Sequence, residues 1–183
     1  MEAYYTYVKK VVGAFAAAGL DYAFTGALAS SFYGVPRTTS DIDVIVAVAN
    51  EADVKAKVAA ALRTAGLVVD ERKIDAALKS GFKIASFKDK TSPYSVDVIF
   101  SSEKLDKRAG KIARLNTYFQ SPEGLITAKL RMIKATLPPE RSAKDKADVK
   151  AILAFTKVDV EAVKRQAQKD RTLKVFESLM SAV

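Results

Sequence analysis

The sequence from Gly26 to Asp43 is GALASSFYGVPRTTSDID, and it leads into the apolar run VIVAV at residues 44–48. That run predicts a buried strand over 41–48, and the glycine and proline at 34 and 36 end a short helix expected over 27–33. Because side chains alternate along a strand, Asp41 and Asp43 should point to one face while Ile42 and Val44 point to the other. The stretch therefore predicts two carboxylates that project together from the start of a buried strand.

Gly26 stands between a short apolar strand expected over 22–25 and this helix. The first backbone N–H groups of a helix lack intrahelical partners, and the positive end of the helix dipole favours anions. Glycine also lets a ligand approach the backbone closely. The turn thus predicts a phosphate cradle opposite a carboxylate metal site, although Gly26 taken alone also fits a routine turn glycine.

The composition narrows the chemistry, since the 183 residues include no histidine and no cysteine. This excludes a Ser-His-Asp triad, a Cys-His nucleophile and an ordinary zinc site. Carboxylate-only sites suit Mg²⁺ or Mn²⁺, which commonly arrive with substrate phosphates. No apolar run approaches the roughly 20 residues that cross a bilayer, and the N-terminus lacks a signal-peptide pattern. We therefore expect a soluble, cytoplasmic protein without a membrane partner.

The net charge of +9 is concentrated toward the C-terminus, where residues 101–183 hold 18 basic and 10 acidic side chains. A basic region of this size attracts polyanions such as nucleic acid or a nucleoside triphosphate. A solvated, lysine-rich helical surface is the alternative explanation.

The remaining pattern predicts an α+β fold. Helices are expected over 3–19 and 51–64, and further strands over 67–70, 82–87 and 94–100, after which the sheet should end. From Ser121 onward the signals are helical: Ser121-Pro122-Glu123 is an N-cap with proline at the first helical position, 142–145 fits a capping pattern, and Asp159 and Thr172 start two more helices. We expect a small mixed β-sheet flanked by helices over 1–118, followed by a helical C-terminal subdomain over 119–183.

Asp97 is a charge embedded in the apolar strand Ser95-Val96-Asp97-Val98-Ile99-Phe100. If this strand lies beside the strand over 41–48, a third carboxylate joins the pair. Three carboxylates can hold two metal ions roughly 3.5 to 4 Å apart, the arrangement used for in-line phosphoryl chemistry such as nucleotidyl transfer. The structural alternative is that Asp41 caps a turn, Asp43 makes a surface ion pair and Asp97 lies on an exposed strand face.

Residues 26–43 resemble the signature of the DNA polymerase beta nucleotidyltransferase superfamily, most closely its AbiEii-like toxin branch. The shared pattern is glycine plus a small residue, a short helix, Tyr-Gly, Arg-x-Thr, and Asp-x-Asp before β-branched residues. The resemblance implies a nucleotidyltransferase fold and an enzyme that binds ATP or another NTP. It also implies that Asp41, Asp43 and Asp97 are catalytic metal ligands, and that Gly26 and Ala27 border the triphosphate.

In the toxin branch a lysine on a later helix and a downstream Lys-Asp motif complete the nucleotide site, and Lys129 and Asp145 look similar to these elements. A lysine beside the triphosphate would neutralise charge that builds up in the transition state. The alternatives are that Lys129 is a solvated lysine and that Asp145 is the acidic partner of a Ser142 cap.

Two further positions of the signature carry expectations. Arg37 either contacts phosphate or pins the loop to an aspartate. Ala27 lacks the hydroxyl that many superfamily members have at this place, so phosphate binding relies on backbone groups and on Ser30 or Ser31.

The leading hypothesis is a metal-dependent transferase that moves a nucleoside monophosphate from an NTP to an acceptor hydroxyl and releases pyrophosphate. The basic C-terminal part favours an RNA acceptor such as the 3′ end of a tRNA, and a protein hydroxyl fits almost as well. A second hypothesis is a catalytically weak or inactive nucleotide- or nucleic-acid-binding module on the same fold. A third, which rests on the family branch alone, is the toxin of a toxin–antitoxin pair.

Overall fold

The computed structural model of the chain describes residues 2–34, 36, 38–81 and 83–181. Its contacts divide the chain into two compact units, the first formed by residues 1–28 and 38–120 and the second by residues 29–37 and 121–183. The domain boundary that the sequence predicts after residue 118 stays a prediction.

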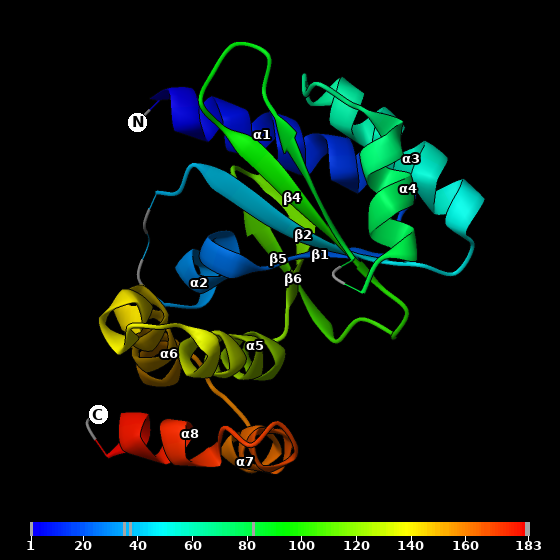
Figure 1. Cartoon of the computed structure of the whole chain (residues 1–183). Coiled ribbons are helices and arrows are strands. Elements are labelled where there is room, and N and C mark those ends of the chain that lie inside the picture. Colours follow the sequence, from blue (N-terminus) through cyan, green and yellow to red (C-terminus); the bar gives the residue numbers. More distant parts are fainter. Residues whose placement is uncertain (1, 35, 37, 82, 182–183) are drawn as a thin grey trace. The chain divides into compact units, whose positions relative to one another are not determined.

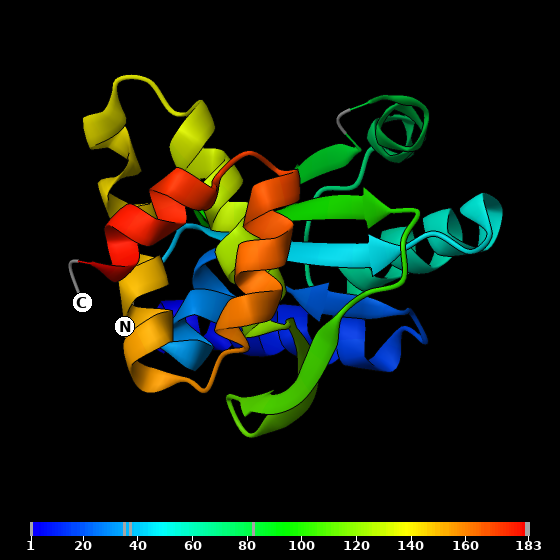
Figure 2. The ribbon, with the colours of Figure 1, turned by 90° about the horizontal axis from the view of Figure 1, so that it is seen from below.

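The first unit is built on a six-stranded sheet in the order β3-β4-β2-β1-β6-β5 (Figure 2). Strand pairs β2–β4 and β1–β6 are parallel and the others are antiparallel, so the predicted α+β class with a mixed sheet is confirmed. The elements in chain order are α1 (Glu2–Ala17), β1 (Tyr22–Phe24), the start of α2 (Gly26–Tyr33), β2 (Asp41–Ala47), α3 (Glu51–Thr64), α4 (Glu71–Lys79), β3 (Ile84–Lys88), β4 (Ser95–Ser101), β5 (Lys107–Ile112) and β6 (Leu115–Gln120).

The core of this unit lies between one face of the sheet and the helices α1, α3 and α4 (Figure 1). Every second residue along β2 and β4 is buried. These residues are Ile42, Val44, Val46, Val96, Val98 and Phe100. The ring of Phe15 on α1 contacts the rings of Tyr22 and Phe24 on β1. Because each fully buried side chain of this size contributes about 1.5–3 kcal/mol, this packing fixes which face of the sheet each strand residue takes.

The structure corrects two sequence predictions. The strand predicted over 67–70 is a single bridge between Leu67 and Asp89. Asp70 instead caps α4, since its side chain accepts a hydrogen bond from the backbone N–H of Arg72. Short apolar runs are ambiguous between strand and helix entry, and here the cap decides.

The expected end of the sheet after residue 100 is also wrong, because the β5–β6 hairpin extends it. The hairpin turns at Ala113 and Arg114, whose φ angles are +52° and +66°. A left-handed turn of this kind usually has the sequence Asn-Gly or Asp-Gly, which is absent here. The charged edge strand β5 also lacks the alternation of apolar and polar residues that is typical of a strand. Both usual strand signals are therefore missing from the sequence.

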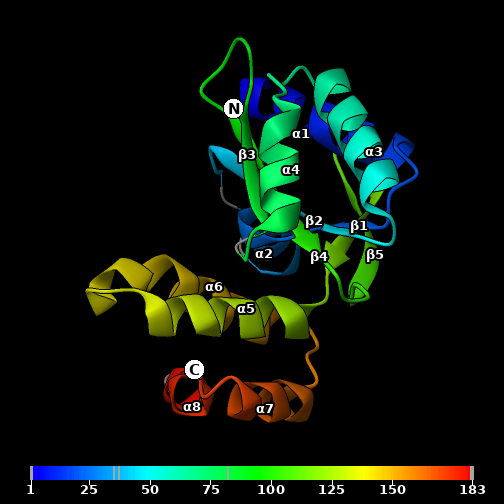
Figure 3. The same ribbon diagram turned by 45° about the vertical axis from the view of Figure 1, so that its right-hand side comes forward.

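The second unit is helical, with α5 and α6 in one layer and α7 and α8 in another (Figure 3). Its elements are the end of α2, α5 (Pro122–Ala135), the 3₁₀ turn η1 (Pro139–Ser142), α6 (Ala143–Phe155), α7 (Val160–Lys169) and α8 (Leu173–Met180). The Ser121 hydroxyl caps α5 by accepting from Gly124 N–H, and Asp159 caps α7, as predicted. Thr172 precedes α8 without a capping bond from its side chain, and the Ser142 hydroxyl donates to the carbonyl of Pro139.

None of the helices in the described part of the chain combines the length and the apolar character that crossing a bilayer requires.

Candidate functional site

Three carboxylates lie close together on the face of the sheet that points away from α1. Asp43 on β2 lies directly beside Asp97 on the parallel strand β4, and Asp41 stands two residues before Asp43. One carboxylate oxygen from each of Asp41, Asp43 and Asp97 lies within 4.8 Å of the other two. All three residues are half-buried. The tertiary structure thus joins the third acidic residue to the pair that the strand alternation predicted.

The carboxylate of Asp41 is held in place by the two residues before it. The hydroxyls of Thr39 and Ser40 both donate to its Oδ1 atom, at 3.0 and 2.9 Å. Among the residues that the structure describes, none bonds to the other oxygen, Oδ2, whose lone pairs can take a further ligand. Sequence reasoning did not single out these hydroxyls, although a run of Thr and Ser just before an aspartate is typical of such local bonds.

Gly26 opens α2 next to this cluster. Its φ of +57° lies in the left-handed region, and a Cβ atom built on it would lie 2.0 Å from Oδ2 of Asp43. The backbone N–H of Thr25 donates to the carbonyl of Asp43 at 2.9 Å. Ala27, the next residue, is buried and contributes only its backbone. The glycine turn and the acidic cluster are therefore in contact with each other and form one site in the first unit.

The cluster fits a hard divalent cation. Three carboxylates this close repel one another, which a bound cation relieves, and an all-oxygen donor set without nitrogen or sulfur suits Mg²⁺ or Mn²⁺.

Tyr7 on α1 is a polar residue near the cluster that sequence reasoning missed. Its side chain is 5% exposed and its ring stacks on Tyr94, 4.8 Å between centroids, at the start of β4. Among the described residues its hydroxyl finds no hydrogen-bond partner. Burial raises the pKa of this hydroxyl, and the carboxylates of Asp89, Asp97 and Asp41 raise it further, so Tyr7 remains a proton donor at neutral pH. In the sequence it is one of several tyrosines in an amphipathic helix.

Lys88 is a cation on the carboxylate face that the sequence did not reveal. In the sheet register Lys88 on β3 lies opposite Ser95 on β4, which in turn lies opposite Asp41 on β2. Side chains that are paired across strands share a face, and two strand spacings amount to about 10 Å. Lys88 is exposed and makes no ion pair within the described parts of the chain. Its ammonium can therefore reach an anion bound beside the aspartates.

In the second unit Lys129 and Asp145 are brought together. The Nζ atom of Lys129 lies 2.9 Å from Oδ1 of Asp145 and 2.8 Å from Oδ2 of Asp148, and the lysine side chain is 7% exposed. The alternative of a solvated Lys129 is therefore wrong. Asp145 pairs with this lysine instead of completing a Ser142 cap, and the sequence had not singled out Asp148.

Three remaining residues were expected near the phosphates: Ser30, Ser31 and Arg37. Ser30 is buried, and its carbonyl accepts from the N–H of Gly34, while Ser31 is half-buried. Arg37 lies outside the described residues.

The chain was compared with known proteins. No protein-family model matches the sequence, and no curated protein sequence matches it significantly. Solved structures do match. The solution structure of the antibiotic-resistance factor ANT(2″)-Ia has a TM-score of 0.67 at 15% identity, over 99% of this chain and 95% of that one.

Two further structures agree with that match. The crystal structure of ANT(2″)-Ia in complex with adenylyl-2″-tobramycin gives a TM-score of 0.65 at 14% identity, over 91% and 96% of the two chains. An antigenic nucleotidyltransferase-like protein from Paracoccidioides brasiliensis gives 0.61 at 13% identity, over 97% and 93%. At these identities the likeness concerns the fold, and the chain therefore has the nucleotidyltransferase fold.

Proposed function

We propose that this chain is a metal-dependent nucleotidyltransferase that transfers a nucleoside monophosphate from an NTP to an acceptor hydroxyl. The observation that carries the proposal is the gathering of Asp41, Asp43 and Asp97 within 4.8 Å, beside the glycine that opens α2. Adjacent carboxylates that hold metal ions are used in phosphoryl chemistry, and a glycine turn at a helix start beside them suits the phosphates of an NTP. The shared fold with nucleotidyltransferase structures supports the same class of reaction.

The carboxylates have separate tasks in this scheme. Asp41 and Asp43 hold the cation, with Asp41 oriented by the hydroxyls of Thr39 and Ser40. When bound, Mg²⁺ or Mn²⁺ would neutralise the phosphates and favour the departure of pyrophosphate. Asp97 accepts the proton of the acceptor hydroxyl as that oxygen bonds to the α-phosphorus. The bond from the α-phosphorus to the oxygen bridging to the β-phosphate breaks, and pyrophosphate leaves with its electron pair.

The phosphates would be held by the first turn of α2. The N-terminal end of this helix would attract an anion, because the helix dipole is positive there. Lys88 supplies a nearby positive charge. On the motif resemblance, Lys129 and Asp145 would contribute to nucleotide binding. Ser30 would supply a hydroxyl to the phosphates in place of the one that Ala27 lacks, and Arg37 would contact either a phosphate or an aspartate. Lys129 is buried against two carboxylates and so has a structural task in any case.

We propose RNA, including the 3′ end of a tRNA, as the first acceptor to test, since the chain carries a net charge of +9. A protein hydroxyl is the second. One of the similar structures, that of ANT(2″)-Ia, contains adenylyl-2″-tobramycin, and this ligand belongs to that protein. Here it supports only the general plan of an acceptor hydroxyl beside a nucleotide.

The experiment is a transfer assay with α-labelled NTPs, Mg²⁺ or Mn²⁺, and bulk RNA or bulk protein as acceptor. Label should move to one acceptor class, and Asp41→Asn, Asp43→Asn and Asp97→Asn should each lower the rate by at least about 100-fold. Asp53→Asn is the matched control, because it removes an exposed carboxylate whose ion pair among the described residues is with Lys57 on the same helix. Rates that survive in all three variants would refute the proposal.

A binding module is the second candidate, and the same samples distinguish it. NTP binding that persists in EDTA, with no transfer to any acceptor, would favour that module. The toxin proposal is tested in cells: growth arrest by the wild type and normal growth with Asp43→Asn would support it, and harmless overexpression of an active enzyme would oppose it.

A further inference from the structure

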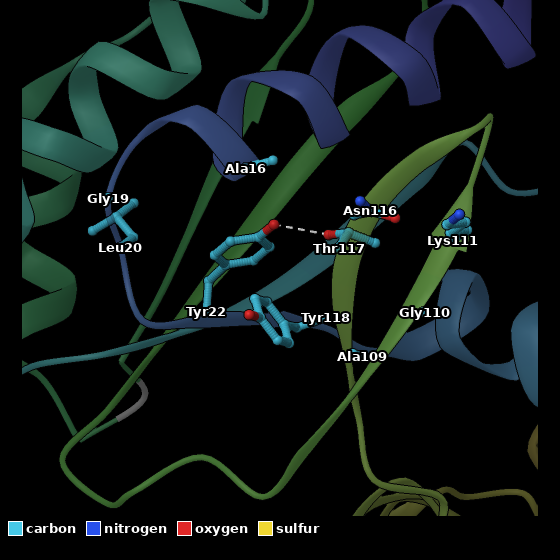
Figure 4. Close-up of a pocket in the computed structure, with 10 residues that line it drawn as sticks. All are labelled: Ala16, Gly19, Leu20, Tyr22, Ala109, Gly110, Lys111, Asn116, Thr117 and Tyr118. Carbon is cyan, nitrogen blue, oxygen red and sulfur yellow. Dashed lines mark hydrogen bonds between the residues drawn. The ribbon is translucent and has the colours of Figure 1, made fainter.

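A pocket of about 480 Å³ lies in the first unit, between the end of α1 and the β5–β6 hairpin (Figure 4). Its walls come from Ala16, Gly19 and Leu20 at the end of α1, Tyr22 on β1, Ala109, Gly110 and Lys111 on β5, and Asn116, Thr117 and Tyr118 on β6. The Tyr22 hydroxyl and the Thr117 hydroxyl are hydrogen-bonded at 2.8 Å. The volume falls in the range of small-molecule sites.

This pocket is separate from the acidic cluster. Tyr22 pairs with Val46, three residues along β2 from Asp43, or about 10 Å at the usual rise of a strand. Its ring also contacts Phe15 on α1, on the face of the sheet that the three carboxylates do not share. The lining of the pocket contains none of the residues to which the transfer reaction has been assigned.

The rings of the pocket offer a stacking surface. Tyr118 remains 43% exposed and meets the ring of Tyr22 edge-on, with 6.0 Å between centroids. Figure 4 shows the two rings next to each other. The ammonium of Lys107 lies 4.3 Å from the centre of the Tyr118 ring and pairs with Asp21, so this aromatic surface is held in place. Exposed aromatic rings backed by a cation are typical of sites that stack nucleobases.

The polar side chains of the pocket could contact the base edge and the phosphate of a nucleotide. Asn116 is exposed, and its amide offers one acceptor and two donors, which match the edge of a base. Lys111 is exposed at the pocket wall, and Arg114 at the adjacent turn. Neither makes an ion pair with any residue that the structure describes. Residues 107–120, which form the hairpin, hold four basic and no acidic side chains, so the hairpin favours an anionic ligand.

We propose that this pocket binds a nucleotide unit, with its base against Tyr118 and Asn116 and its phosphate at Lys111. The unit is either a free nucleotide or one residue of a single-stranded nucleic acid. This inference does not depend on the transfer reaction, because the pocket needs neither the carboxylates nor a metal.

The experiment measures binding of the full chain in excess EDTA, so that the acidic cluster cannot recruit metal-bound nucleotide. One arm titrates adenosine monophosphate, and the other titrates a fluorescein-labelled single-stranded RNA read by anisotropy. Tyr118→Ala should weaken binding by roughly 5- to 150-fold, the effect of one stacked base. Lys111→Glu should weaken it more than Lys104→Glu, which makes the same charge change just before β5 and outside the pocket wall.

The two arms identify the source of the ligand. Binding in both indicates a free-nucleotide site, and binding of RNA alone indicates a strand. Photocrosslinking of a thiouridine-containing RNA should map to the peptides that carry Tyr22 or Tyr118. Equal losses in Lys111→Glu and Lys104→Glu with no change in Tyr118→Ala would mean diffuse attraction to a basic surface and would overturn the proposal, as would the absence of binding in both arms. Because these side chains are exposed, thermal melts should show all three variants folded.

Discussion

Gly26 and Asp43 are so close that any side chain at position 26 would collide with the carboxylate: a Cβ there would lie 2.0 Å from Oδ2. The relationship links the helix start that would hold phosphate to a carboxylate that would hold metal. Gly26→Ala should therefore displace Asp43 or the first turn of α2. We expect a loss of transfer of at least about 100-fold and a loss of the stabilisation by Mg²⁺, measured by thermal unfolding with and without the ion.

Gly19 provides the matched control for that variant. Its φ of +64° is similarly left-handed, yet a Cβ added there meets nothing within 4 Å. Gly19→Ala should cost about 1 kcal/mol from backbone strain alone and keep the response to Mg²⁺. Equal behaviour of the two variants would show that strain, and not the contact with Asp43, explains the effect at position 26.

Lys88 should contribute to binding of the nucleotide. Lys88→Met removes a positive charge from the carboxylate face without disturbing the core, since the side chain is exposed. We expect NTP affinity to fall by roughly 2- to 5-fold at low salt and the difference to shrink at high salt. Lys90→Met, on the exposed turn after β3, should leave affinity unchanged. Identical titrations for the two variants would remove Lys88 from the phosphate site.

Lys129 should contribute mainly to the stability of the folded chain. Lys129→Met leaves the carboxylate of Asp148, only 9% exposed, without the ammonium that lies 2.8 Å away. Breaking such a buried pair costs about 3–5 kcal/mol, measurable by urea unfolding. Lys134→Met, exposed on the same helix, should have almost no effect. A Lys129→Met protein as stable as the wild type but with raised KM for NTP would instead favour a purely nucleotide-binding lysine.

Tyr7 should make the stability of the fold depend on pH in the alkaline range. Burial and then the neighbouring carboxylates raise its pKa in the folded state. Below the ordinary tyrosine pKa of about 10 the hydroxyl is neutral in both the folded and the unfolded chain. Above it the unfolded chain loses this proton while the folded chain keeps it, so the stability of the fold falls as the pH rises. Tyr7→Phe should flatten the fall of the melting temperature above this pH, whereas the exposed Tyr5→Phe should not. Because the Tyr7 hydroxyl is buried without a hydrogen bond among the described residues, Tyr7→Phe should also be neutral or stabilising at pH 7. Destabilisation at pH 7 would show that the hydroxyl has a partner.

Some features of the candidate site followed from local sequence. The alternation along residues 41–48 assigned Asp41 and Asp43 to one face because burial of Ile42 and Val44 fixes the register. Ser121 and Asp159 marked helix starts because capping is a bond between near neighbours in the chain. The α+β class with a mixed sheet and a helical C-terminal part was likewise predicted from element types and order.

Other features depend on contacts between distant residues. The sequence could not place Asp97 beside Asp43, since strand adjacency between β2 and β4 is set by packing across 54 residues, from 43 to 97. Nor did it reveal the β5–β6 hairpin, the pocket at Tyr118 or the partners of Lys129, all of which lack a local signature. The sequence by itself determined which side chains point together within one strand and where helices begin, because those depend on near neighbours. Only the tertiary structure decided which strands lie side by side, and so which charges share a site.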